Sequence, residues 1–358
     1  MIQFLLRRLL VTIPVLLGIV FIVFALARLV PGDPCRAVLG ERATDAVCDD
    51  FIHRTGLDQP IPAQFALYLG QLANGDLGVS IQHSRPVTTL LIERLPTTVE
   101  LTLLAMLFAI VVGVPLGLIS AYRRNSPIDV GTMVFANLGV SMPVFVLGLL
   151  LAYLFAIVLK GTPFNLPPSG RLSTGVDVVP LVEVWGLTNL TGPPRAILDF
   201  VSGIYTLTAL ITGQWGAFVD ALRHLILPAV ALGTIPLAII ARITRSSLLD
   251  VLGLDYVRTA RAKGLNERGV VLRHAARNAL LPVVTIIGLQ LGALLSGAVL
   301  TETVFNLAGV GRSLFEAITG RDYVVIQGFT LLIAVTYVTV NLIVDVSYGF
   351  LDPRVRAR

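Results

Sequence analysis

The sequence has few charged residues. Asp, Glu, Lys and Arg together make up 14% of the 358 residues, whereas a soluble domain is about one quarter charged. Hydrophobic residues make up 55% of the chain. A chain of this composition has too few polar side chains to cover its own surface in water. The composition therefore excludes a soluble globular domain and indicates an integral membrane protein.

Histidine is also rare, and a phosphate-binding motif is absent. The four histidines, His53, His83, His224 and His274, are scattered without the spacing of metal ligands. No two of them lie close in sequence, and no pair of carboxylates is expected to face the membrane interior, so the sequence gives no support to a membrane enzyme. The chain also lacks the Gly-x-x-x-x-Gly-Lys-Ser/Thr pattern. We therefore do not expect it to hydrolyse ATP itself.

Six stretches are long and apolar enough to cross a bilayer, for which a helix needs about 20 residues. They are Leu9–Val30, Leu101–Tyr122, Val130–Leu159, Leu225–Ile243, Ala279–Leu300 and Gln327–Tyr348. The third stretch carries Ser141, Met142 and Pro143 in its middle, where we expect a kink. The pattern predicts an all-α membrane protein with six transmembrane helices.

The distribution of lysine and arginine predicts the orientation of these helices. If the N-terminus is cytoplasmic, basic residues outnumber acidic ones in the inside segments but not in the outside segments. The inside segments then receive Arg7, Arg8, Arg123, Arg124, the basic residues between Arg242 and Arg277, and Arg354, Arg356 and Arg358. Both termini are therefore expected in the cytoplasm. The net charge of +5 reflects this topology rather than a nucleic-acid surface, because the basic residues lie beside apolar spans.

The expected spans divide the chain into three parts. Residues 1–30 contain the cytoplasmic N-terminus and the first transmembrane helix, and residues 31–98 form an extended extracytoplasmic segment. Residues 99–358 form a core with the other five helices, an extracytoplasmic insertion at 161–223 and a cytoplasmic loop at 244–278. Within the insertion, Ile204–Ile211 is apolar but too short to span a membrane. We expect this piece at the membrane interface or packed against the outer mouth.

The only two cysteines, Cys35 and Cys48, both fall in the first extracytoplasmic segment. The bacterial periplasm and the cell exterior are oxidising, so a disulfide between these residues is expected. In the chain-entropy model, closing a loop of this size stabilises the fold by about 3 kcal/mol. Two unrelated free thiols are the alternative.

Polar side chains within the spans are candidates for a functional role. Asn341 and Asp345 are four residues apart and share a face of the sixth expected helix. Asp345 lies near the cytoplasmic end, so an ion pair with a neighbouring arginine is the alternative, and we favour this structural interpretation. Glu100 stands at the outer edge of the second expected helix, where we expect it to be solvated.

The most informative segment is the cytoplasmic loop between the fourth and fifth expected helices. Asp255 is a suitable N-cap and Gly264 a suitable helix stop, with about two helical turns between them. Tyr256, Val257 and Ala260 share one face of this short helix. Its other positions are Arg258, Thr259, Arg261, Ala262 and Lys263. A short, capped helix with small residues is suited to docking in a groove of another protein, and contact with anionic lipid head groups is the alternative.

This loop resembles the EAA loop of ABC importer permeases, which reads Glu-Ala-Ala, three residues, Gly and a proline further downstream. Here Arg258-Thr259-Ala260 takes the place of the triplet, and Gly264 and Pro282 follow. Residues 255–264 are most similar to the dipeptide/oligopeptide/nickel permease family, in which arginine at the glutamate position is usual. Further pieces that resemble the same family are Phe4–Arg8, Pro31–Pro34, Thr244–Ser247, Leu300–Phe305, Arg321–Tyr323, Gln327–Gly328, Asn341–Asp345 and Leu351–Arg354.

The chain departs from the pattern of that family in two places. Residues 306–311, Asn-Leu-Ala-Gly-Val-Gly, stand where the family has an aromatic-Pro-Gly turn. Residues 173–200 are an expanded part of the second extracytoplasmic segment. Because both departures lie outside the expected membrane helices, they bear on the substrate or the binding protein rather than on the mechanism.

The resemblance implies a permease of the bacterial cytoplasmic membrane that is not itself an enzyme and holds no metal or cofactor. Its implied partners are a second related permease, two ATPase subunits that bind ATP and magnesium, and an extracytoplasmic substrate-binding protein. The helix at 255–264 is then the contact to an ATPase. The implied substrates are di- or oligopeptides, and nickel, glutathione or another small solute is the alternative within the family. A secondary transporter would be expected to show inverted repeats and broken midplane helices, and we see no repeat between the halves.

Overall fold

The computed structural model describes residues 2–29, 35–36, 40 and 42–351. Within these residues the chain is helical, with one isolated β-bridge between Val79 and Pro86 and no strand. The expected all-α class is therefore confirmed. The helices are α1 (Ile2–Leu29), α3 (Asp45–Thr55), α4 (Ile61–Ala73), α5 (Val87–Tyr122), α6 (Pro127–Ser141), α7 (Val144–Ala152), η1 (Tyr153–Val158), α8 (Leu181–Val184), α9 (Pro193–Ser202), α10 (Tyr205–Ile211), α11 (Trp215–Leu252), α12 (Asp255–Ala262), α13 (Glu267–Gly269), η2 (Val270–Ala275), α14 (Ala276–Gly297), α15 (Val299–Val304), α16 (Val310–Thr319) and α17 (Tyr323–Leu351).

Several of these helices are suited to a membrane by length and composition. Among the described residues, four stretches are long and apolar enough to cross one, namely Val87–Tyr122, Trp215–Leu252, Glu267–Leu295 and Tyr323–Ile343. Two bent pairs of helices raise this number to six if each pair is one span, namely α6 with α7–η1 and α9 with α10. Within α1, Leu10–Ala25 is a shorter apolar stretch. Each expected span therefore coincides with an apolar helix or a bent pair.

The third expected span is a broken helix rather than a single kinked one. The axes of α6 and α7–η1 differ by 102°. Met142 and Pro143, which separate them, have extended backbone angles, with φ −97° and ψ 133° at Met142 and φ −56° and ψ 132° at Pro143. Proline disfavours helical angles at the residue before it and cannot donate a backbone hydrogen bond. The Ser-Met-Pro sequence therefore ends one helix and begins another.

The centre of the molecule is the close packing of α5 against α11. A Cβ atom built on Gly117 of α5 would lie 2.5 Å from the backbone oxygen of Ala241, and one on Gly233 of α11 would lie 2.6 Å from that of Ala105. Glycine at these positions lets the two helix backbones approach directly, as is common between membrane helices. The core around this crossing includes Leu101, Ala109, Leu225, Leu237, Ile240, Val283 and Phe305.

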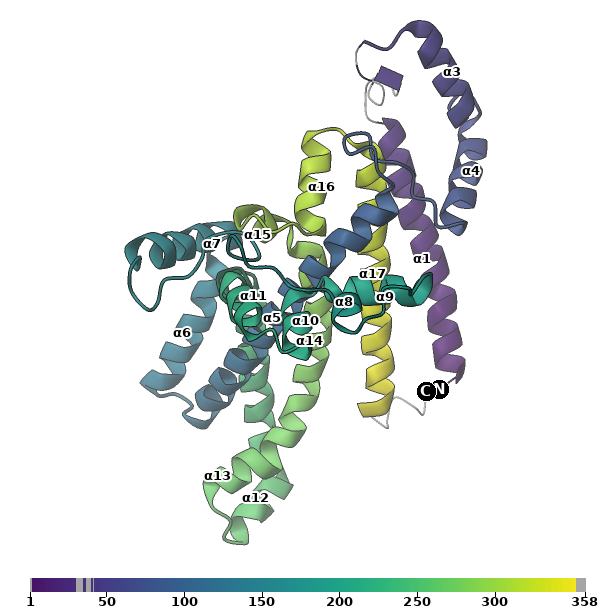
Figure 1. The fold of residues 1–358 in the computed structure, drawn as a ribbon. Coiled ribbons are helices and arrows are strands. Elements are labelled where there is room, and N and C mark those ends of the chain that lie inside the picture. Colours follow the sequence, from purple (N-terminus) through teal and green to yellow (C-terminus); the bar gives the residue numbers. More distant parts are fainter. Residues whose placement is uncertain (1, 30–34, 37–39, 41, 352–358) are drawn as a thin grey trace.

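The helices define two ends of the molecule (Figure 1). At one end, α12 and α13 project beyond the long helices, and at the other end lie α3 and α16. Towards this second end, α4 packs on α1 through aromatic side chains: the ring of Phe24 lies 5.2 Å from that of Phe65 and 5.7 Å from that of Tyr68. The connection that carries α3 and α4 and the helix α16 therefore lie towards the end opposite the short loop between α11 and α14, whereas α8, α9 and α10 lie beside the middle of the long helices.

A buried carboxylate organises the end that carries α16. Glu302 of α15 is fully buried and accepts hydrogen bonds from the Thr98 hydroxyl at 2.7 Å and from the Arg312 backbone N–H at 2.9 Å. Burial raises the pKa of Glu302 to about 6, although these hydrogen bonds act to lower it. A Cβ atom on Gly309 would overlap this carboxylate. Within residues 306–311, Gly309 thus stands where the backbone closes on Glu302.

Candidate functional site

The loop between α11 and α14 folds as the short helix α12. Asp255 is the first residue of this helix rather than its N-cap, so the predicted cap was wrong by one position. Leu254 has the extended N-cap conformation, with φ −79° and ψ 150°, and offers no side-chain cap. Asp255 acts instead through its charge in the first turn, where a carboxylate is favoured by the helix dipole. Its carboxylate also lies 3.4 Å from Arg258.

The end of α12 follows the prediction. Gly264, just after the cap residue Lys263, has φ +80°, a left-handed conformation that glycine adopts without strain. A Cβ atom built on Gly264 would meet nothing within 4 Å, so the surroundings of this turn are open. Asn266 then caps the next helix, because its side chain accepts a hydrogen bond of 2.8 Å from the Gly269 backbone N–H. The helix is therefore held at a defined length.

One face of α12 is anchored to the membrane helices. Val257 is fully buried and Ala260 nearly so. They pack in a small cluster, here called the α12 seat, that also contains Ala121 of α5, Leu248 of α11, Val270, Val271 and Ala275 of η2, and Ala279 of α14. Tyr256 is partly exposed, and its hydroxyl accepts a hydrogen bond of 2.8 Å from the Asn278 side chain. The predicted apolar face is thus confirmed, and it joins α12 to three long helices.

The opposite face of α12 is exposed and carries mainly basic or small residues, together with Asp255. Arg261 makes a two-point contact with Glu267 at 2.7 and 3.1 Å, which ties α12 to α13. The remaining exposed residues of this face are Asp255, Arg258, Thr259, Ala262, Lys263 and Gly264. The carboxylate on α13 holds one arginine in place and leaves the small residues uncovered. This geometry suits contact with another protein, because small side chains permit close approach and the charges at the edge can steer it.

The structure gives the other predicted residues different surroundings. Cys35 and Cys48 form a disulfide with Cα atoms 5.3 Å apart.

Asn341 of α17 is partly buried near Gly292 of α14, and its Oδ1 has no hydrogen-bond partner among the described residues. The side chain of Asp345 lies outside the described part of the chain, so the predicted shared face is not tested. No group of three or more His, Cys, Asp or Glu suited to a metal occurs in the described residues.

The expectation that Glu100 is solvated was wrong. Glu100 is 2% exposed and forms an ion pair with Arg171, which lies in the connection between η1 and α8. The Thr206 backbone N–H also donates to Glu100 at 2.6 Å. In the sequence, Glu100 stands at the start of an apolar helix and Arg171 in a Pro- and Gly-rich segment. Neither pattern indicates that these two residues form an ion pair.

Two family models match this sequence and together cover most of it. Residues 113–357 match the family described as binding-protein-dependent transport system inner membrane component. Residues 1–102 match the N-terminal part of such membrane components. The chain belongs to this family. The exposed α12 therefore lies within the matched part of an inner membrane component of a binding-protein-dependent transport system.

Curated relatives of this family member match over almost the full length of both chains. The dipeptide transport system permease proteins of Alkalihalophilus pseudofirmus and Escherichia coli are 43% and 44% identical to it, and each match covers 99% of this chain and 100% or 99% of the relative. The di/tripeptide transport system permease protein of Pseudomonas aeruginosa is 45% identical, with 99% of both chains covered. The predicted membership of an ABC peptide-importer permease family is confirmed, and so is the location in the bacterial inner membrane.

Proposed function

We propose that this chain forms the translocation path for dipeptides in an ATP-driven importer, together with a second permease. The full-length identity to permease proteins named for dipeptide transport carries this proposal. Two ATPase subunits, which bind ATP and magnesium, supply the energy, and an extracytoplasmic binding protein delivers the peptide. The chain itself holds no cofactor in this scheme. Oligopeptides, glutathione and nickel are the other substrates to be compared in the test.

In this proposal, α12 transmits the conformational change of an ATPase to the membrane helices. Its exposed face from Arg258 to Gly264 enters a groove of the ATPase, and its buried face from Val257 to Ala260 presses on the α12 seat. When the ATPases close on ATP, α12 moves, and the bundle changes from inward- to outward-facing. Only the different affinities of the two conformations for ATP can drive such a change. The helix length fixed by Gly264 and Asn266 supports this role, because a frayed helix would absorb the displacement.

The importer proposal predicts that the tagged chain, extracted from its own membrane in mild detergent, brings with it two ATPases and a second permease. Proteoliposomes of this complex should take up labelled dipeptide only when ATP, magnesium and the binding protein are all present. The control is the same complex with the nonhydrolysable ATP analogue. Isolation of the chain as a homo-oligomer that moves solute without ATP would contradict the proposal. The uptake of a tetrapeptide, glutathione and nickel ions is measured in parallel, and the relative uptake rates rank the substrates.

We further propose six membrane spans, formed by α1, α5, the broken pair α6 and α7–η1, α11, the continuous helix from α13 to α14, and α17. The loop that carries α12 and both termini are then cytoplasmic, and residues 31–98 and 161–223 are extracytoplasmic. The gathering of α3 and α16 at the end opposite α12 supports this arrangement. The excess of basic residues near α12 supports it too, because such residues favour the cytoplasmic side.

This topology predicts that Cys35 and Cys48 are oxidised in the cell. Only an extracytoplasmic location exposes them to an oxidising compartment. Intact-mass analysis of protein alkylated before and after reduction should show two added groups after reduction only. The control is a Cys35→Ser/Cys48→Ser variant, which should add none under either condition. Rapid alkylation of both thiols without reductant would contradict either the extracytoplasmic location of this segment or the disulfide.

A further inference from the structure

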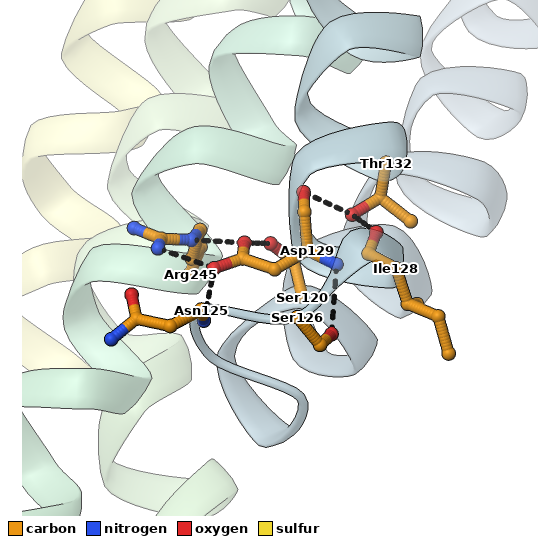
Figure 2. A network of polar contacts seen from close by, with 7 residues as sticks. All are labelled: Ser120, Asn125, Ser126, Ile128, Asp129, Thr132 and Arg245. Atoms are coloured by element: carbon orange, nitrogen blue, oxygen red, sulfur yellow. Dashed lines mark hydrogen bonds and ion pairs between the residues drawn. The ribbon is translucent and has the colours of Figure 1, made fainter.

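Outside the α12 seat, the structure contains an ion pair between a buried carboxylate and a partly exposed arginine, and this carboxylate has every acceptor position filled. Asp129, in the first turn of α6, is 4% exposed. Arg245 of α11 donates to both of its oxygens, from Nε and from Nη2, at 2.8 Å each. The Ser120 hydroxyl of α5 and the Asn125 backbone N–H supply two more hydrogen bonds. Figure 2 shows these donors converging on one carboxylate from three directions.

This ion pair fixes the N-terminal end of α6 to α11, and further along the helix α6 packs closely on α11 at Gly139. Only Asp129 and Ala136 are buried among the residues of α6, so most of this helix lacks cover from the rest of the chain. A two-point contact between arginine and a carboxylate fixes orientation as well as distance. A second polar contact between α6 and α11, from Arg242 to the Asn137 side chain, is exposed. The Asp129–Arg245 pair is therefore the buried polar attachment of α6 to α11.

The same stretches of α5 and α11 that hold this pair also hold α12. On α11, Arg245 stands three residues before Leu248, and on α5, Ser120 directly precedes Ala121. Leu248 and Ala121 belong to the α12 seat. A displacement of α12 therefore acts on the helix segments that carry the donors to Asp129. From there it can reach α6 and, across the break at residues 142–143, α7.

We propose that Asp129 and Arg245 are positioning residues that make α6 move as one body with the α12 seat during transport. This inference rests on the proposed function, in which an ATPase displaces α12. Breaking the pair lets the seat move without α6, so ATP is hydrolysed without driving the bent pair α6 and α7–η1. The two residues contact neither nucleotide nor peptide in this role, and their effect passes through the position of α6.

A purely local role of Asp129 makes a different prediction. Its carboxylate also holds the turn between α5 and α6, in which Asn125 has a left-handed conformation with φ +60°. Asp129→Asn weakens both this turn and the contact to α11. Arg245→Gln removes only the contact to α11 and leaves Ser120 and Asn125 in place. If the pair links α6 to α11, both variants should have the same effect. If its role is confined to the turn, Arg245→Gln should behave as the unaltered chain.

The test measures the distance between α6 and α11 in the complete transporter. Cysteines are introduced at Val134 of α6 and Ser246 of α11, which are both exposed, and are spin-labelled. The native cysteines do not react because they form the disulfide. In the unaltered complex we expect one narrow distance distribution that is the same without nucleotide and after vanadate trapping. In Asp129→Asn and Arg245→Gln we expect a broader distribution that shifts between the two states.

The same complexes are assayed for dipeptide uptake and ATP hydrolysis in proteoliposomes. We expect both variants to lower uptake about tenfold, which is within the range for positions that modulate coupling, while basal ATP hydrolysis is retained. Asn137→Ala, which removes the exposed contact between the same helices, should keep both the native distance and the native uptake. If either single variant does not assemble, the Asp129→Asn/Arg245→Gln double variant leaves no unpaired buried charge. The same loosening and loss of uptake are expected for it.

The link is overturned if Arg245→Gln, or the double variant used in its place, keeps a native distance distribution or takes up dipeptide at the native rate. It is also overturned if the distance in the unaltered complex changes between the two states. These results are distinct from failure of the proposed function. In that case the unaltered complex itself shows no ATP-dependent uptake, while the distance measurement still reports whether the pair holds α6 to α11.

Discussion

Replacing Gly264 with aspartate is expected to uncouple dipeptide uptake from ATP hydrolysis while the protein still inserts in the membrane. No neighbouring atom of the chain opposes a side chain here, because a Cβ atom on Gly264 meets nothing within 4 Å. The added carboxylate instead meets the surface of the ATPase at a point where small residues allow close approach. Loss of a central interface contact costs about 2 kcal/mol or more, so uptake should fall at least about 30-fold.

Gly264→Ala is the matched control for this variant. It introduces the same backbone strain at φ +80°, which for a residue with a Cβ atom is about 1–2 kcal/mol, but adds no charge and little volume. We expect it to keep more uptake than Gly264→Asp and to retain the ATPases on purification. Native uptake by Gly264→Asp, or equal losses in the two variants, would remove Gly264 from the docking surface.

Replacing Arg171 with methionine is expected to give the largest loss of stability. Arg171 is 13% exposed, pairs with Glu100, donates to the Gly203 backbone oxygen at 2.7 Å and lies over the Tyr205 ring, 3.7 Å from its centroid. Removing it leaves the Glu100 carboxylate buried without its charge partner. Breaking a buried pair from one side costs about 3–5 kcal/mol. Thermal unfolding of the purified complex in detergent, followed by tryptophan fluorescence, measures this loss.

Two further variants separate the charge effect from a general effect of substitution. Glu100→Gln combined with Arg171→Met leaves no unpaired charge, and we expect it to be more stable than Arg171→Met alone. Arg195→Met breaks the exposed pair with Asp199 and should cost less than about 1 kcal/mol, because such pairs are screened by water. An unchanged unfolding temperature for Arg171→Met would mean that the segment at 161–223 is not held by this pair.

The interpretation of the loop at 244–278 from sequence succeeded because its signals are local. The left-handed position of Gly264 and the shared face of Val257 and Ala260 each depend on residues within a few positions of one another. Local rules of backbone conformation and helix periodicity act over such distances. The cap at Asp255 was wrong by one residue, because an N-cap is defined by the backbone angles and not by the side chain alone.

Contacts between distant residues could not be predicted in this way. Glu100 and Arg171 are 71 positions apart, and Asp129 and Arg245 are 116 positions apart. Each side chain alone has several acceptable surroundings, including water and lipid head groups. A single sequence does not show which arginine pairs with which carboxylate, because the pairing depends on how the helices pack. The break between α6 and α7 was predicted in position but not in extent for the same reason.

The sequence by itself determined that this chain is an all-α membrane protein with apolar helices, a short capped helix in its basic loop and the features of a binding-protein-dependent permease. These properties follow from composition, periodicity and local backbone preference, which do not depend on the rest of the fold. Only the tertiary structure decided that Val257 and Ala260 rest on α5, α11 and α14, that Glu100 is buried, and that Asp129 joins α6 to α11. A buried ion pair depends on both of its members, and packing of the long helices sets which partner is there.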